Sequence, residues 1–396
     1  MRNNNTVRYD ILSYQGLSAL YALGLSLWAG TIYLYMKQVG YSYGQINLFL
    51  SLFWLITCLT EIPSGFLADM FGALKLTFLS SLFRGSGLLF LALFEHNLTI
   101  LVLSAILTAV GDSFYSGTLT AWIVEKTKKT DLDQNKLFSH NYMLVSLISF
   151  IGGYFGADFL GNFELRAPLI CGACILYVTG ILALSLTRFD LELRPRKKIV
   201  KFDRNVWQKK RPLFETLVLF LPLTFVTVGP YNQWQLYFQH GTKIKTGAIL
   251  VGINVCAILG AMLFDFLIKI RLQAEKLFLA HVLALCISVW IMVCSSYYWA
   301  LIFMWLHVAL CASAEVLQTK LLHEKITDDL RTTWVSVNNT LEALVTTLAL
   351  ALNGFLADHF GLAIAWGSGA LLGFLITFGW YTWQISRQKK LKGRDQ

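Results

Sequence analysis

Charged residues are scarce in this sequence of 396 residues. Asp, Glu, Lys and Arg together make up 14% of the chain, whereas hydrophobic residues make up 56%. A water-soluble protein of this length has no core large enough to bury so much apolar surface, so the composition excludes an ordinary soluble globular protein. The mean hydropathy of +0.57 instead indicates a membrane protein.

Recognisable catalytic and metal-binding motifs are missing as well. His323-Glu324 lacks the second histidine of an HExxH motif, and no Gly-x-x-x-x-Gly-Lys phosphate loop occurs. His307, Cys311 and Glu315 share one face of a predicted helix, but no third hard ligand stands at a matching position. We therefore expect no enzyme, no cofactor and no metal site.

Twelve apolar stretches are long enough to cross about 30 Å of hydrocarbon as helices. Each is bounded by charged residues, Gly, Pro or Asn. We therefore expect an all-α membrane protein with twelve transmembrane helices. The expected spans are residues 14–36, 43–68, 74–94, 98–124, 137–160, 166–187, 213–238, 246–268, 277–295, 298–322, 333–357 and 363–386.

The distribution of Lys and Arg predicts the orientation, because these residues stay on the cytoplasmic side during insertion. With a cytoplasmic N-terminus, only four of the 33 Lys and Arg residues fall in the outer loops, namely Lys37, Arg166, Lys243 and Lys245. One more lies inside a span, and all the others fall on the cytoplasmic side. An even number of spans with both termini in the cytoplasm follows. The net charge of +10 then reflects topology and attraction to the anionic inner leaflet, and no nucleic-acid partner is expected.

One long polar segment, residues 188–212, divides the chain. It is rich in Lys and Arg, and we interpret it as a basic cytoplasmic linker lying on the inner leaflet. It separates an N-terminal six-helix bundle, residues 1–187, from a C-terminal six-helix bundle, residues 213–396, which ends in a basic cytoplasmic tail.

An unusual octet occurs twice. GFLADMFG, residues 65–72, ends the second span, and GFLADHFG, residues 354–361, ends the eleventh. Weaker versions place Asp158 at the end of the fifth span and Asp265 at the end of the eighth. An aspartate therefore ends every third span, alternately inside and outside. This pattern predicts inverted three-helix repeats, which are typical of secondary transporters.

The segment GFLADMFGALK resembles the conserved loop between spans two and three of the major facilitator superfamily, whose pattern is Gly-x-x-x-Asp-Arg-x-Gly-Arg-Lys. Gly65, Asp69, Gly72 and Lys75 match it, whereas its two arginines are replaced. The resemblance implies two six-helix bundles in a bacterial plasma membrane, with these four residues in gating. Asp69 would pair across the interface between the halves, and Gly65 would allow close approach of a neighbouring helix.

Two further motifs, EIPSGxxAD and SGTLTAW, look like those of bacterial drug exporters. Drug/proton antiporters usually have an arginine in span four and a Gly-Pro-x-x-Gly-Gly run in span five, and neither occurs here. The function we expect is proton-coupled efflux of lipophilic or cationic small molecules by alternating access. The alternatives are uptake of a neutral polar nutrient, such as a sugar or peptide, and a transporter-fold sensor without transport.

Five charged residues fall inside the expected spans. An ionised side chain at the bilayer centre costs about 2.5–3.5 kcal/mol, so each should face a cavity, find a partner or be protonated. The proton-coupling candidates are Glu61, Asp112, Glu315 and Glu342, and Arg84 is a candidate for a buried ion pair with Asp112.

The resemblance also implies that spans one, four, seven and ten line the central cavity. Aromatic walls beside a carboxylate suit a lipophilic cation through stacking and cation–π contact. The substrate-binding candidates are Tyr21, Trp28, Asp112, Tyr115, Tyr231, Asn232, Gln235 and Glu315.

Other residues receive structural interpretations. Tyr33, Tyr35 and Trp122 are expected at the membrane–water interface, where aromatic belts form. Pro230 is expected to break the seventh span near its middle. The partners we expect are a small-molecule substrate, protons and the lipid bilayer, with the chain acting as a monomer.

Overall fold

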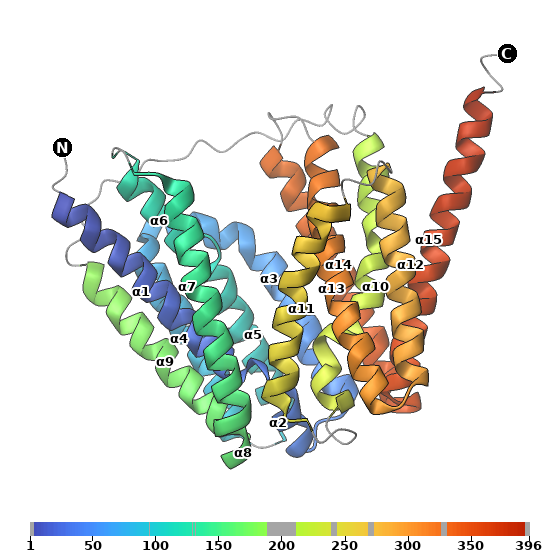
Figure 1. Ribbon diagram of the computed structural model, residues 1–396. Helices are drawn as coiled ribbons and strands as arrows, with labels where there is room; N and C mark the ends of the chain where they lie inside the picture. The colour runs from blue at the N-terminus through green and yellow to red at the C-terminus, as the bar shows by residue number, and fades with distance from the viewer. Residues whose placement is uncertain are drawn as a thin grey trace. The chain divides into compact units, whose positions relative to one another are not determined.

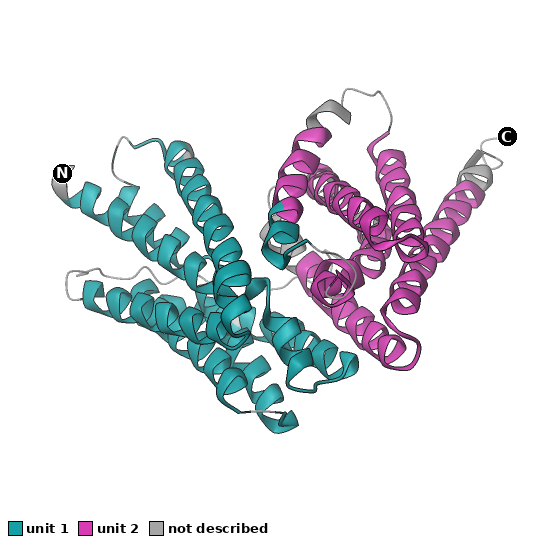
Figure 2. Ribbon diagram, turned by 60° about the horizontal axis from the view of Figure 1, so that its bottom comes forward, with its two compact units in different colours: residues 1–199, 244–251 teal, residues 200–243, 252–396 magenta. Residues whose placement is uncertain are grey.

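The computed structural model describes residues 4–94, 96–128, 130, 132–187, 211–238, 244–267, 273–325 and 331–392, which contain helices and no strands. The chain divides into two compact units (Figure 2). Unit 1 comprises Met1–Ile199 and Ile244–Val251, and unit 2 comprises Val200–Lys243 and Gly252–Gln396. The expected linker lies outside the described residues, apart from its last two positions, which begin a helix.

Unit 1 is built around the helix α4. This helix packs against α5 and α9, while α3 packs against α5, and α1 packs against α7 and α9 (Figure 1). The elements are α1 (Asn4–Ala29), α2 (Ile32–Gln38), α3 (Tyr43–Phe71), α4 (Ala73–Leu93), α5 (Leu98–Tyr115), α6 (Thr118–Thr127), α7 (Gln134–Tyr154), the π-helix η1 (Phe155–Leu160), α8 (Gly161–Phe163) and α9 (Ala167–Leu186).

Unit 2 has α10 and α12 near its centre. The helix α10 packs against α13, α14 and α15, and α12 packs against α13 and α15. The elements are α10 (Arg211–Phe238), α11 (Thr246–Leu267), α12 (Ala274–Cys294), α13 (Tyr297–Lys325), α14 (Arg331–Phe360) and α15 (Leu362–Lys392). Residues 246–251 at the start of α11 belong to unit 1, and the remainder of the helix belongs to unit 2.

Among the described residues, the structure has 11 helical segments that are long and apolar enough to cross a membrane. These correspond to every expected span except the seventh, which is the helix α10. Residues 213 and 214, which begin that span, have side chains outside the described part of the chain. Twelve spans and the inverted repeats therefore stay predictions.

The repeated octets have the same local structure at both places. Gly72 ends α3 and Gly361 ends α14, with φ angles of 89° and 86°. Their N–H groups donate to the carbonyls of Ala68 and Ala357, at 2.9 and 3.0 Å. Glycine adopts positive φ without the steric cost that a Cβ imposes. Each octet therefore ends one helix and starts the next within one residue.

Short polar sequences determine where two other helices begin. Ser42 and Gln45 form a capping box at the start of α3, in which each side chain bonds the other residue's backbone N–H. The Asn97 side chain accepts hydrogen bonds from the N–H groups of Thr99 and Ile100 at the start of α5. These contacts satisfy N–H groups that have no partner within the helix.

Two expected spans of unit 1 are interrupted. Span one breaks between α1 and α2 at Gly30 and Thr31, and span four breaks between α5 and α6 at Ser116 and Gly117. Gly117 has a φ angle of 68°, which separates the two helices. The predicted break at Pro230 is wrong, because α10 runs continuously through it. Pro230 removes one N–H donor, but packing against α13, α14 and α15 keeps the helix intact.

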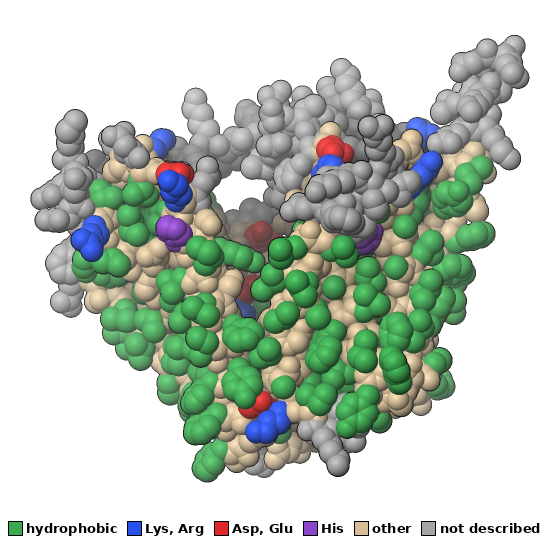
Figure 3. Space-filling view, in the orientation of Figure 1, with side chains coloured by type: hydrophobic (Ala, Val, Ile, Leu, Met, Phe, Trp, Pro, Cys, Tyr) green, Lys and Arg blue, Asp and Glu red, His purple; other side chains and the backbone are tan. Residues whose placement is uncertain are grey.

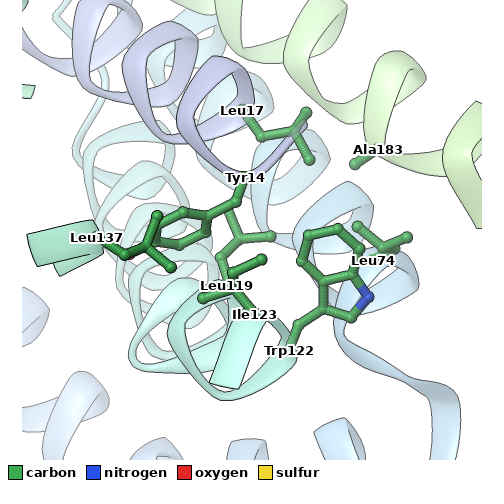
Figure 4. Packing of buried hydrophobic residues seen from close by; sticks show 8 residues of the cluster. All are labelled: Tyr14, Leu17, Leu74, Leu119, Trp122, Ile123, Leu137 and Ala183. Atoms are coloured by element: carbon green, nitrogen blue, oxygen red, sulfur yellow. The ribbon is translucent and has the colours of Figure 1, made fainter. Parts of the chain in front are cut away.

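One end of unit 1 is held by a cluster of buried apolar side chains from five helices, in which Tyr14 and Trp122 are the largest residues (Figure 4). Trp122 is 8% exposed and Tyr35 is 3% exposed. Tyr35 donates its hydroxyl to the carbonyls of Leu91 and Ala92. The predicted interfacial position of Tyr35 and Trp122 is therefore wrong, since helix packing buries both rings. Tyr33 is half-buried.

Outward-facing side chains of the helices are mainly apolar. Exposed Leu, Ile, Phe and Met residues occur on most helices of both units, and hydrophobic side chains cover much of the surface seen in Figure 3. Charged side chains in that view lie mostly near helix ends. Such a surface suits contact with hydrocarbon.

Candidate functional site

Unit 1 contains a buried ion pair between neighbouring helices. Arg84 on α4 donates a hydrogen bond from Nη1 to the carboxylate Oδ1 of Asp112 on α5. The Arg84 side chain is 8% exposed and that of Asp112 is 35% exposed. The guanidinium carbon also lies 5.8 Å from the ring centroid of Phe53, within cation–π range. The positive charge is thus neutralised inside unit 1.

Gly111 explains how the two helices come close enough for this pair. A Cβ at Gly111 would lie 2.8 Å from both the backbone nitrogen of Arg84 and the carbonyl oxygen of Ser80. The Ser80 hydroxyl donates to the Gly111 carbonyl at 2.6 Å. No larger side chain fits between these backbones, so the sequence Gly111-Asp112 places the carboxylate directly beside α4.

Two tyrosines continue this polar cluster. Tyr21 on α1 is 1% exposed, and its hydroxyl forms a hydrogen bond with that of Ser80 at 2.9 Å. Its ring stacks on Tyr115, with centroids 3.5 Å apart and planes 1° from parallel. Tyr115 is half-buried and stands at the end of α5, directly before the break in span four. Tyr115 is therefore the accessible member of the stack, and Tyr21 supports it from behind.

Unit 2 contains carboxylates without a cationic partner. Glu315 on α13 and Glu342 on α14 are exposed and close enough to interact electrostatically. Neither forms an ion pair with a side chain in the described parts of the chain. Those parts include Lys320, which lies on the same helix as Glu315. Asn338 donates an amide hydrogen bond to Oε2 of Glu342 at 3.5 Å. Unit 2 thus presents two carboxylates without a counter-charge among the described residues, whereas unit 1 presents a neutral pair.

A pocket lies beside Glu342, between α10, α13 and α14. One side is apolar and comes mainly from Leu217, Phe220 and Leu221 of α10. Polar atoms are supplied by Thr224, Gln318, Asn338 and Glu342. The pocket has a volume of about 10 Å³, which is enough for about one water molecule.

The candidates on α10 have different surroundings. Tyr231 is 57% exposed and interacts electrostatically with Glu315. Asn232 is half-buried and donates its amide to the carbonyl of Val228 at 2.8 Å. Gln235 is 3% exposed. Tyr231 is therefore the residue of this group with its side chain open to a ligand beside Glu315.

Gln233 belongs to the packing of unit 2. It is 1% exposed, and its Oε1 accepts a hydrogen bond from the indole Nε1 of Trp366 at 2.8 Å. The Trp366 ring stacks on Tyr237, with centroids 4.5 Å apart. Gly229 leaves room for this indole, because a Cβ there would lie 2.7 Å from Trp366.

The remaining candidates lie apart from these clusters. Glu61, Asp69 and Lys75 are exposed at the end of α3 and the start of α4. The half-buried Trp28 packs on Gly172 of α9.

A Cβ built at Gly65 would meet no atom within 4 Å. The expected close approach of a neighbouring helix at Gly65 stays a prediction. Gating by these residues stays a prediction.

Sequence reasoning missed several residues that build the two clusters. Phe53, Ser80 and Gly111 surround the ion pair, and Gln318 and Asn338 lie with Glu342. Only the small residues carried a signal, since Ser and Gly favour close helix packing in membranes. In the described parts of the chain, no group of three or more His, Cys, Asp and Glu side chains is placed to bind a metal.

Comparison with known proteins agrees with this architecture. The family model described as Major Facilitator Superfamily matches residues 16–271. An uncharacterized MFS-type transporter of Bacillus subtilis (strain 168), YxaM, is 22% identical over 238 residues, which are 57% of this chain and 58% of the relative. The match thus spans less than two thirds of that relative's length.

Solved transporter structures share the fold. A mutant of the nucleoside transporter NupG superposes with a TM-score of 0.79 at 13% identity, covering 94% of this chain and 99% of that one. A POT family transporter in complex with a thioalcohol-conjugated peptide has a TM-score of 0.75 at 11% identity, covering 95% and 96%. The family match over more than half of the sequence shows that this chain belongs to the major facilitator superfamily of membrane transporters.

Proposed function

We propose that this protein is a proton-coupled secondary transporter that exports lipophilic or cationic small molecules. The observation that carries the proposal is the pair Glu315 and Glu342, which interact with each other and lack a cationic partner among the described residues. Two uncompensated carboxylates in transmembrane helices must either take up a proton or attract a cation. A proton and a cationic substrate then compete for the same place, which is the requirement for exchange.

The surroundings of the carboxylates support a substrate that has both a cationic and an apolar part. Tyr231 offers an exposed aromatic ring near Glu315, and apolar side chains of α10 lie beside Glu342. In unit 1, by contrast, Arg84 already neutralises Asp112. We therefore assign coupling to Glu315 and Glu342, and we assign Asp112 to the ion pair.

The test uses purified protein in proteoliposomes with an imposed pH gradient and tetraphenylphosphonium as the cation. We expect gradient-driven movement of the cation by the native protein and a decrease of about tenfold or more in Glu315→Gln, because a neutral amide neither carries the proton nor attracts the cation. Glu324→Gln is the matched control. That residue lies on the same helix and pairs with Lys320, with 52% of its side chain exposed, so this substitution should leave transport unchanged.

Uptake of a neutral polar solute is a second candidate, supported by other observations. The stacked pair Tyr21 and Tyr115 offers one half-buried aromatic face, and amides line the pocket of unit 2. The similar folds include nucleoside and peptide transporters. Uridine and dialanine are therefore tested in the same vesicles. If the folded protein accumulates either solute and leaves tetraphenylphosphonium unmoved, uptake replaces export as the function.

A further inference from the structure

The small pocket beside Glu342 in unit 2 is lined by oxygen-bearing side chains from three helices. Thr224 of α10 has a hydroxyl oxygen, Gln318 of α13 and Asn338 of α14 have amide oxygens, and Glu342 of α14 has a carboxylate. Among the described residues, no His or Cys lines the pocket. Hydroxyl, amide and carboxylate oxygens are the ligands that hard cations prefer in proteins. The pocket therefore has the donor set of a site for such a cation.

These polar side chains are not occupied by contacts within unit 2. The side chains of Thr224 and Gln318 form no hydrogen bond with any residue in the described part of the chain. Thr227, one turn further along α10, instead donates its hydroxyl to the carbonyl of Leu223 at 3.0 Å, the usual arrangement within a helix. Asn338 reaches Oε2 of Glu342 only at 3.5 Å, which is long for a hydrogen bond. The oxygens of the pocket are therefore available to a ligand.

The charge of Glu342 decides between a cation and a water molecule. Glu342 forms no ion pair in the described parts of the chain, and Glu315 interacts with it as a second carboxylate. A water molecule would add hydrogen bonds but would leave the negative charge without a counter-charge. A carboxylate in a membrane span is costly unless it is neutralised or paired. The charge therefore favours a cation in the pocket.

Size and charge balance select the kind of cation. A volume of about 10 Å³ holds about one water molecule, and a dehydrated sodium ion fits such a space, whereas a potassium ion is larger. One carboxylate lines the pocket, which balances one positive charge. Magnesium gives up its water molecules reluctantly and demands six ligands in octahedral geometry. Sodium is the common cation that meets these conditions.

The apolar side of the pocket strengthens the attraction between a cation and Glu342. Leu217 and Phe220 of α10 are both buried and line this side. They exclude water and lower the local dielectric constant, so opposite charges attract each other more strongly. The pocket lies about two turns before the end of α13 and about three turns after the start of α14. An ion therefore has a short path along the helix ends.

We propose that Thr224, Gln318, Asn338 and Glu342 form a sodium site in unit 2. The ion takes oxygen ligands from all four side chains and neutralises Glu342 without a proton. Sodium and a proton therefore compete for the same carboxylate. This assignment rests on the coupling role proposed for Glu342 above, and it names a second ion that the carboxylate can take.

Binding of radioactive sodium to the purified protein in lipid nanodiscs tests the site without a substrate or a gradient. The buffer is alkaline and contains choline as the other cation. We expect saturable binding in the native protein and none in Glu342→Gln. Thr224→Val keeps the side-chain shape and removes one oxygen ligand, so the dissociation constant should rise about tenfold. Thr227→Val is the matched control, because that hydroxyl is bonded within α10, and its sodium affinity should equal that of the native protein.

Three outcomes would overturn the sodium site. Absence of saturable binding in the folded native protein would leave water as the occupant of the pocket. Equal affinities of Thr224→Val and Thr227→Val would place sodium elsewhere. Displacement by potassium or calcium as effective as that by unlabelled sodium would contradict the argument from size and charge. None of these results depends on movement of tetraphenylphosphonium, so sodium binding can fail while proton-coupled export stands, and export can fail while sodium still binds.

Discussion

The ion pair between Arg84 and Asp112 allows a quantitative test of what holds unit 1 together. Replacing Asp112 by alanine leaves a guanidinium that is 8% exposed without its counter-charge. Removing one partner of a buried ion pair costs about 3–5 kcal/mol. We expect about 3 kcal/mol here, at the low end of that range, because the Asp112 side chain is 35% exposed and water partly screens the pair.

The reciprocal variant should behave differently. Arg84→Met leaves a carboxylate that is partly exposed and can be hydrated or protonated, so we expect a loss of about 1–2 kcal/mol. The double variant, Arg84→Met with Asp112→Ala, leaves no unpaired charge. It should be more stable than Asp112→Ala alone, with a coupling energy of about 2 kcal/mol between the two sites.

The assay is reversible unfolding in mixed micelles titrated with sodium dodecyl sulfate, followed by circular dichroism for all four proteins. Additive effects of the two single substitutions, within about 0.5 kcal/mol, would refute the reasoning, because independent sites add in this way. Transport provides the second readout. A double variant that recovers stability and still transports identifies the pair as structural, whereas recovered stability without transport would return Asp112 to the coupling candidates.

Three further predictions follow from the packing and the sequence motifs. Gly156→Ala should lower the free energy of unfolding by at least about 2 kcal/mol, because the added methyl overlaps a backbone carbonyl that cannot rotate away. Gly65→Ala, where space is open, is the control and should leave the thermal midpoint nearly unchanged. Similar midpoints for the two variants would contradict this prediction. Trp366→Phe should lower the free energy of unfolding by about 1–3 kcal/mol, since it removes the hydrogen-bond donor to the buried Gln233. Thermal unfolding measures this loss, and a midpoint like that of the native protein would show that the hydrogen bond is dispensable. Asp69→Asn should lower the transport rate and leave the substrate dissociation constant unchanged; weaker binding with a normal rate would argue against its gating role.

The helices could be predicted from the sequence because each depends on a local property. Long apolar runs require helical structure in a membrane, since every backbone N–H and carbonyl must find a partner within the segment. The repeated octets marked two helix ends, and Gly72 and Gly361 show why, because both adopt a positive φ angle.

The candidate site was predictable only in part. Charged residues within apolar runs are conspicuous, so Arg84, Asp112, Glu315 and Glu342 could be identified directly. Their surroundings could not, because a buried aromatic residue looks the same in sequence as one at the membrane interface. Trp122 is the example, since its burial depends on helices from distant parts of the chain.

Helical structure, a membrane location and carboxylates within apolar spans could all be predicted from the amino-acid sequence. These properties follow from composition and local order, which act within one helix at a time. Helix packing brings Arg84 beside Asp112, Glu315 close enough to Glu342 to interact with it, and Asp158 into a hydrogen bond at the start of α11. The physical reason is that a charge takes its role from the groups that surround it, and helix packing brings those groups from distant parts of the chain.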